Sequence, residues 1–94
     1  SSYRSWRFNN KIRSMPAGKK LRIEVLAPAR IHWSIDGWAS VRDTGTAENL
    51  FGLHVADLPA EALAAGAAID FTFFWTEAGH WENVDFSVRI EKPA

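Results

Sequence analysis

Hydrophobic and polar residues alternate along most of the chain, a pattern typical of β-strands with one face in a core and the other in water. The segment 20–25 shows it plainly, because Leu21, Ile23 and Val25 share one face while charged residues occupy the other. The same alternation predicts strands at 30–36, 38–43, 50–58, 69–76 and 84–91, and a weaker one at 6–15. We therefore expect about seven short strands and no long helix.

Turn-forming residues separate these segments. The Asp36-Gly37 pair predicts a tight hairpin turn, because both residue types tolerate positive φ. Residues 77–80 predict another turn, and the Ala-rich stretch 59–65 predicts one short helical turn. Short strands at near-regular spacing predict an all-β fold, an antiparallel immunoglobulin-like β-sandwich.

The inward phase of each strand defines a predicted hydrophobic core. Trp33 and Trp75 keep this phase and are expected to be structural, as is Trp6 in the weak first strand. The remaining inward positions are Leu21, Ile23, Val25, Ile31, Ile35, Val41, Leu53, Val55, Ile69, Phe71, Phe73, Val84, Phe86, Val88 and Ile90.

The chain has 94 residues, which fits a single domain over 1–94. A domain of this size holds one modest core and leaves little room for a deep catalytic cleft. It contains no cysteine, so disulfides and thiolate metal sites are excluded. The chain begins at Ser1 without an initiator Met or a signal peptide, and we expect it to be a piece of a longer polypeptide.

The charge is balanced, with 11 basic and 11 acidic residues. Electrostatic capture of nucleic acid or of an anionic membrane needs clustered positive charge, so neither partner is expected. No apolar run approaches the roughly 20 residues of a membrane-spanning helix. We expect a monomer.

No catalytic motif is present. The three histidines lack the spacing of a metal site, and neither a phosphate-binding loop nor a nucleophile elbow occurs. We predict no catalytic residue, no metal and no cofactor. No acidic cluster is dense enough to indicate a calcium site, although Asp43 and Asp85 would offer oxygen ligands if the fold brought them together.

Several aromatic residues violate the core phase, and they carry the functional prediction. The chain has five Trp, more than a core of this size needs. His32, Trp38 and Phe74 fall on polar strand faces, and Trp81 follows a turn among polar residues. An exposed indole covers the apolar C–H face of a sugar ring, while polar groups bind its hydroxyls. The predicted carbohydrate-binding residues are His32, Asp36, Trp38, Phe74, Trp81 and Asn83.

Two segments resemble starch-binding carbohydrate-binding modules of the family-25 and family-26 type. They are Ile31-His32-Trp33 followed by Asp36-Gly37-Trp38, and Trp81-Glu82-Asn83 ahead of the last strand. The resemblance implies an immunoglobulin-like sandwich on which His32, Trp38 and Trp81 form an open platform for an α-1,4-glucan or maltooligosaccharide. It also implies a linked glycoside hydrolase domain and a secreted or periplasmic location. Trp33 departs from the family pattern, which usually has Tyr there.

Two other functions are compatible with the same residues. A structural accessory domain would bury its extra aromatic residues against a catalytic neighbour, because aromatic residues are also enriched at protein interfaces. The other alternative is an adhesion or partner-binding sandwich unrelated to sugars.

Overall fold

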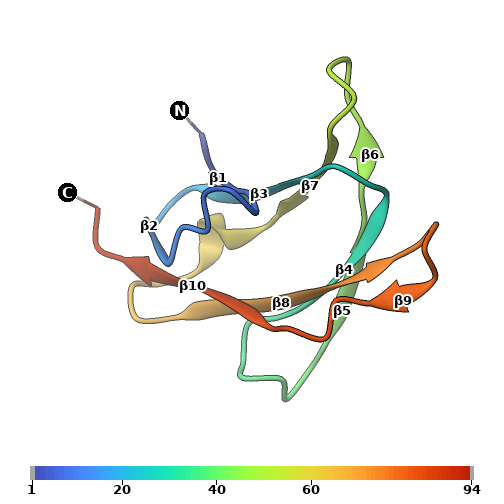
Figure 1. Cartoon of the computed structure of the whole chain (residues 1–94). Helices are drawn as coiled ribbons and strands as arrows, with labels where there is room; N and C mark the ends of the chain where they lie inside the picture. The colour runs from blue at the N-terminus through green and yellow to red at the C-terminus, as the bar shows by residue number, and fades with distance from the viewer. Residues whose placement is uncertain (1, 94) are drawn as a thin grey trace.

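The computed structural model describes residues 2–93 as two β-sheets packed face to face (Figure 1). The strands are β1 (Tyr3–Trp6), β2 (Ser14–Pro16), β3 (Lys20–Val25), β4 (Ala29–Ser34), β5 (Arg42–Gly45), β6 (Ala47–Glu48), β7 (His54–Leu58), β8 (Ala68–Trp75), β9 (His80–Trp81) and β10 (Phe86–Glu91). A single 3₁₀ turn, η1 (Ala60–Ala62), lies where the Ala-rich stretch predicted a short helical turn.

The strands form a four-stranded sheet in the order β1-β3-β7-β6 and a six-stranded sheet in the order β2-β10-β8-β4-β5, with β9 paired to β8. The predicted all-β sandwich is confirmed. Most pairs are antiparallel, but β1 runs parallel to β3 and β2 runs parallel to β10. The N-terminal segment thus pairs first with one sheet and then with the other, and it covers an edge of each.

Among residues 2–93, sixteen hydrophobic side chains are buried and form the core between the sheets. Trp6 lies among them with 1% of its surface exposed. Its ring centroid is 5.1 Å from that of Phe71 and 4.8 Å from that of Phe86. The prediction that Trp6 and Trp33 are structural is confirmed, and Trp75 packs against the core while only partly buried.

Three predicted core positions are wrong, because the chain leaves the strand geometry around them. Ile35 and Val41 are exposed in the 35–41 loop, where the sequence predicted a tight hairpin and a strand beginning at Trp38. Val84 is exposed because β10 begins only at Phe86.

The phase of β7 was also predicted wrongly. The strand begins at His54, after a turn at its N-terminal side, and its buried residues are Ala56 and Leu58. Leu53 and Val55, the predicted inward residues, are only partly buried. A shift of one residue moves every side chain of a strand to the opposite face, so the added turn accounts for the error.

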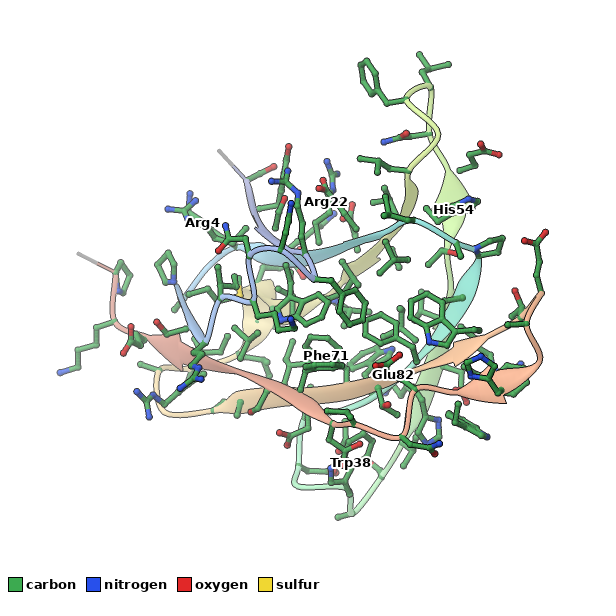
Figure 2. All side chains as sticks on the ribbon, in the orientation of Figure 1. Arg4, Arg22, Trp38, His54, Phe71 and Glu82 are labelled. Carbon is green, nitrogen blue, oxygen red and sulfur yellow. The ribbon has the colours of Figure 1, made fainter. Side chains whose placement is uncertain are left out.

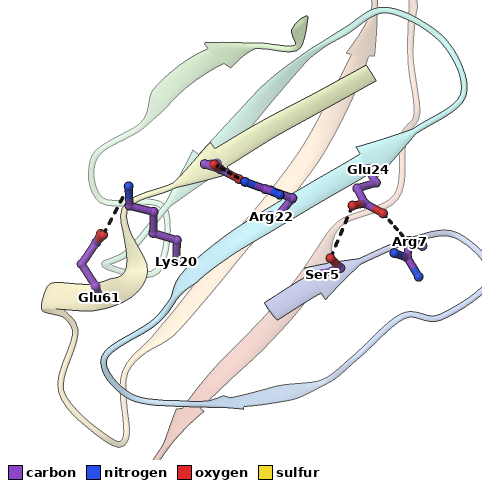
Figure 3. A network of polar contacts seen from close by, with 7 residues as sticks. Ser5, Arg7, Lys20, Arg22, Glu24 and Glu61 are labelled. Carbon is purple, nitrogen blue, oxygen red and sulfur yellow. Dashed lines mark hydrogen bonds and ion pairs between the residues drawn. The ribbon is translucent and has the colours of Figure 1, made fainter. Parts of the chain in front are cut away.

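Charged residues cover the outer face of the four-stranded sheet (Figure 3). Arg22 donates two hydrogen bonds to Asp57, 2.8 Å and 3.0 Å long, and its guanidinium lies over the ring of Tyr3. Glu24 accepts hydrogen bonds from Ser5 and Arg7 (Figure 3). This face is occupied by its own ion pairs, which is the solvated surface that the alternation in 20–25 predicts.

Candidate functional site

Four aromatic side chains gather on the outer face of the six-stranded sheet; we call His32, Trp38, Phe74 and Trp81 the aromatic platform. The ring centroids of His32 and Trp38 are 5.8 Å apart, and the rings are stacked at 21°. Trp81 meets His32 edge-on at 5.3 Å and Phe74 at 5.2 Å. The four rings are therefore in continuous contact.

The platform lies outside the core. Figure 2 shows Trp38 beyond the six-stranded sheet, on the side opposite Phe71, which lies between the two sheets. Trp81 keeps 39% of its surface exposed, whereas His32, Trp38 and Phe74 are partly buried. The out-of-phase residues of the sequence are thus separated from the core by a whole sheet.

Strand register brings the platform residues together. His32 on β4 lies opposite Thr72 on β8, and Phe74 two positions further along β8 lies opposite Trp81 on β9. Alternate residues of a strand share a face, so these positions point to the same side. Residues far apart in the sequence become neighbours because β8 pairs with both β4 and β9.

Asp43 and Arg30 support the platform, and the sequence did not single out either for this role. The Nδ1 atom of His32 lies 2.8 Å from a carboxylate oxygen of Asp43, its partner across β4 and β5. Arg30 lies 3.7 Å from the same oxygen and places its guanidinium 5.0 Å from the Phe74 ring centroid. The only sequence signal for the His32–Asp43 contact was the β4–β5 pairing, whose register depends on the length of the 35–41 loop.

The 35–41 loop presents Trp38 through a turn of unusual backbone geometry. Gly37 and Trp38 have φ values of 67° and 71°, and the N–H of Ala39 lies 3.4 Å from the carbonyl oxygen of Asp36. The sequence located this turn one residue too early, with Asp36 and Gly37 as its central pair. A bulky residue with positive φ is rare, so the ring of Trp38 is held in a conformation that costs free energy.

Asp36 organises this loop from within. Its carboxylate accepts hydrogen bonds from the Ser40 hydroxyl at 2.6 Å, the Ser40 N–H at 2.9 Å and the Ser34 hydroxyl at 2.8 Å. The Ser34 oxygen in turn accepts the N–H of Trp38 at 2.9 Å. The hydrogen bonds from Ser40, followed by that from Ser34, lower the pKa of Asp36 to about 2. The carboxylate thus helps to position Trp38, while the sugar contact that the sequence predicts for Asp36 stays a prediction.

Asn83 follows Trp81 by two residues, just beyond the end of β9. Its side chain is exposed and its φ is 64°. The neighbouring backbone is fixed where the Thr72 hydroxyl donates a 2.7 Å hydrogen bond to the carbonyl of Val84. The amide of Asn83 therefore projects from an anchored segment.

The two outer faces of the sandwich differ in character. The four-stranded sheet shows paired charges, whereas the six-stranded sheet shows contiguous aromatic rings with one histidine. Within residues 2–93, no group of three or more His, Cys, Asp or Glu side chains is arranged to hold a metal ion. No helix in the same range has the length and hydropathy needed to cross a membrane.

Two curated proteins match the chain, both cycloisomaltooligosaccharide glucanotransferases of Niallia circulans. One is 30% identical over 96 residues and the other 29% identical over 98, and each match covers 90% of this chain. The chain is homologous to a short segment of these enzymes. It spans 10% of their length.

No family model and no solved structure matches the chain. The resemblance to starch-binding modules of the family-25 and family-26 type therefore stays a prediction.

Proposed function

We propose that this domain is a non-catalytic module that binds an α-glucan on the aromatic platform. The observation that carries the proposal is the continuous contact of His32, Trp38, Phe74 and Trp81 on an outer sheet face, outside the core. The predicted core is complete without these rings. A ligand that uses flat apolar surfaces is the simplest reason to keep them on the outside.

The chemistry of the platform suits a neutral sugar. Glucose rings present apolar C–H faces that stack on indole, and hydroxyl rims that need hydrogen-bond partners. Asn83 and the second ring nitrogen of His32 supply such partners beside the rings. An open site of this kind binds weakly, with a Kd of about 10 μM to 1 mM.

The glucan itself is proposed from two sources. The resemblance to starch-binding modules favours α-1,4-linked glucose, whereas the relatives are named for cyclic isomaltooligosaccharides, in which the linkage is α-1,6. Both polymers offer the same pyranose faces. The linkage preference is therefore a separate question, and the test must contain both ligands.

In this proposal the domain is covalently linked to a glucan-processing catalytic domain and holds it on the polymer. A binding module raises the local concentration of its attached catalytic domain on a polymer by tethering. The homology to a tenth of a glucanotransferase supports such a linkage. Polysaccharide too large to enter a cell is met outside it, so we propose a secreted or periplasmic location.

Calorimetric titration with maltoheptaose, isomaltoheptaose and cellohexaose tests the proposal. Heat with either α-glucan and none with cellohexaose supports it. Trp81→Ala should then cost on the order of 1–3 kcal/mol of binding free energy, by analogy with stacking on aromatic platforms. Phe51→Ala is the matched control, because Phe51 is an exposed aromatic residue at the tip of the β6–β7 hairpin, outside the platform. No heat from the folded domain with any glucan refutes the proposal.

A second candidate function is a structural accessory domain docked on a protein neighbour. The observation that favours it is the tip of the β6–β7 hairpin, where Leu50 and Phe51 are 100% and 87% exposed. Asn49 holds this tip rigidly, since its side chain accepts the N–H groups of Phe51 and Leu53. Self-association of the isolated domain that Leu50→Ser and Phe51→Ser abolish, without any response to glucans, would favour this candidate.

A further inference from the structure

A groove of about 660 Å³ opens at the end of the sandwich where β8 turns into β9. Both ends of the described chain lie at the opposite end of the sandwich (Figure 1). The side chains of Phe8, Leu26, Pro28 and Trp75 form much of its wall, and Glu77 and His80 stand in the hairpin that borders it. None of these six residues belongs to the aromatic platform.

The groove and the platform use opposite faces of one hairpin. Phe74 and Trp81 are paired across β8 and β9 and face the platform, while Trp75 is paired with His80. Because successive residues of a strand alternate between faces, Trp75 and His80 point the other way, into the groove. The groove and the aromatic platform are thus separated only by the thickness of this hairpin.

Trp75 is a fixed ring in the groove wall. One face stacks on Phe73 with 5.1 Å between centroids and 12° between planes. The indole N–H donates a 2.9 Å hydrogen bond to Glu82, so its polar atom is satisfied within the protein. The rest of the Trp75 ring is an apolar surface in the groove wall. The ring centroid of Phe8 lies 5.9 Å from that of Trp75.

The polar groups around the groove favour a neutral ligand with hydroxyl donors. Three carboxylates, those of Glu24, Glu77 and Glu82, line it together with one guanidinium, that of Arg7. Arg7 is paired with Glu24, which leaves a net negative rim that repels anions. Glu77 has no described partner within residues 2–93, and the Nδ1 atom of His80 contacts the Trp81 carbonyl at 3.2 Å. Free carboxylate oxygens beside flat rings match the hydroxyl rim and apolar face of a sugar.

We propose that this groove is a second carbohydrate subsite, which takes a glucose unit of an α-glucan against Trp75 and Phe8. The proposal rests on the function proposed for the platform and extends it to the other face of the β8–β9 hairpin. Two weak sites on one rigid hairpin increase retention on a polymer far more than on a short oligosaccharide, because the second contact becomes intramolecular.

Titration of the ¹⁵N-labelled domain with isomaltoheptaose and with maltoheptaose, followed by NMR, tests this inference. The indole N–H signals report separately on Trp38 and Trp81 at the platform and on Trp75 at the groove. The buried Trp33 serves as the internal reference, because the ring of Trp6 packs on Phe8 of the groove wall. We expect the Trp75 signal to shift with a sugar, and nuclear Overhauser effects to join glucose protons to its ring.

Two variants separate the groove from the platform. In Trp81→Ala, the Trp75 response should persist, because the groove wall is unchanged. In Glu77→Ala, groove affinity should fall by about 2- to 13-fold, the effect of one hydrogen bond, while the platform signals respond as before. Glu61→Ala is the matched control, since Glu61 is an exposed carboxylate on η1 that does not line the groove.

The outcomes for the two sites are distinguishable. Shifts at Trp38 and Trp81 with no contact at Trp75 overturn the groove proposal and leave the platform function standing. Contacts at Trp75 alone support the groove and overturn the platform. A Trp75 shift that disappears in Trp81→Ala is a relayed effect and also overturns the groove. The absence of all shifts overturns both.

Discussion

The imidazole ring of His32 stacks on the indole ring of Trp38 with 5.8 Å between centroids and 21° between planes. One ring stands on β4, and the other stands on a loop that Asp36 holds in place. Their parallel arrangement depends on the strand register and on the loop geometry at the same time.

Replacing Trp38 tests whether the loop holds this residue under backbone strain. Trp38→Gly and Trp38→Ala both remove the ring, so both should lose glucan affinity to the same extent. Only Gly adopts the φ of 71° without steric cost. We expect Trp38→Gly to be more stable than Trp38→Ala by about 1 kcal/mol, measured by urea unfolding. Equal stabilities would show that the positive φ is not strained.

The stability of the domain should depend on the ionisation of Asp36. Hydrogen bonds from Ser40 and Ser34 lower its folded-state pKa to about 2 from an ordinary value of 3.8. A depressed pKa adds stability above the ordinary pKa, and this contribution is lost as the pH falls toward 2. We expect the difference in unfolding free energy between wild type and Asp36→Asn to shrink between about pH 4 and pH 2. Asp57 also has a lowered pKa, because of Arg22, but it titrates in both proteins and cancels. A difference that is constant with pH would contradict the role of Asp36.

Asp43 should influence ligand binding through His32. The carboxylate contacts Nδ1 of His32 at 2.8 Å and thereby fixes the orientation of the ring. We expect Asp43→Ala to weaken glucan binding by about 2- to 13-fold, the effect of one hydrogen bond, in calorimetric titration. Asp57→Ala is the control, because Asp57 also makes side-chain hydrogen bonds, with Arg22, but lies on the outer face of the four-stranded sheet, away from the four rings. If Asp43→Ala binds the glucan as tightly as wild type, Asp43 does not contribute to ligand binding.

The five tryptophans should differ in how readily a soluble quencher reduces their fluorescence, because they differ in burial. Trp6 and Trp33 have 1% and 4% of their surface exposed, whereas Trp81 has 39%. We expect acrylamide to quench one fraction of the emission readily, and Trp81→Phe to reduce that fraction. A bound α-glucan should protect it, because sugar rings would cover the platform. Quenching that neither Trp81→Phe nor a glucan changes would contradict the exposed platform.

The fold class followed from local pattern. Alternation placed Leu21, Ile23 and Val25 on one face, and the same rule located Phe71 and Phe73 in the core. Such assignments need only the period of a strand and the free energy of burying apolar side chains. They failed at Ile35, Val41 and Val84, where loops replaced the expected strands, and in β7, where the inward phase is shifted by one residue.

For the candidate site, sequence by itself determined which residues stood out. His32, Trp38, Phe74 and Trp81 broke the core phase, and that local property is visible without coordinates. Only the tertiary structure decided that their rings touch, that Asp43 holds His32, and that Asp36 serves the loop. It also showed that Trp75, which alternation had assigned to the inward face, borders a groove. The physical reason is that alternation assigns a side chain to a face of its strand, whereas contact between faces depends on strand order and register, which arise from pairings distant in sequence.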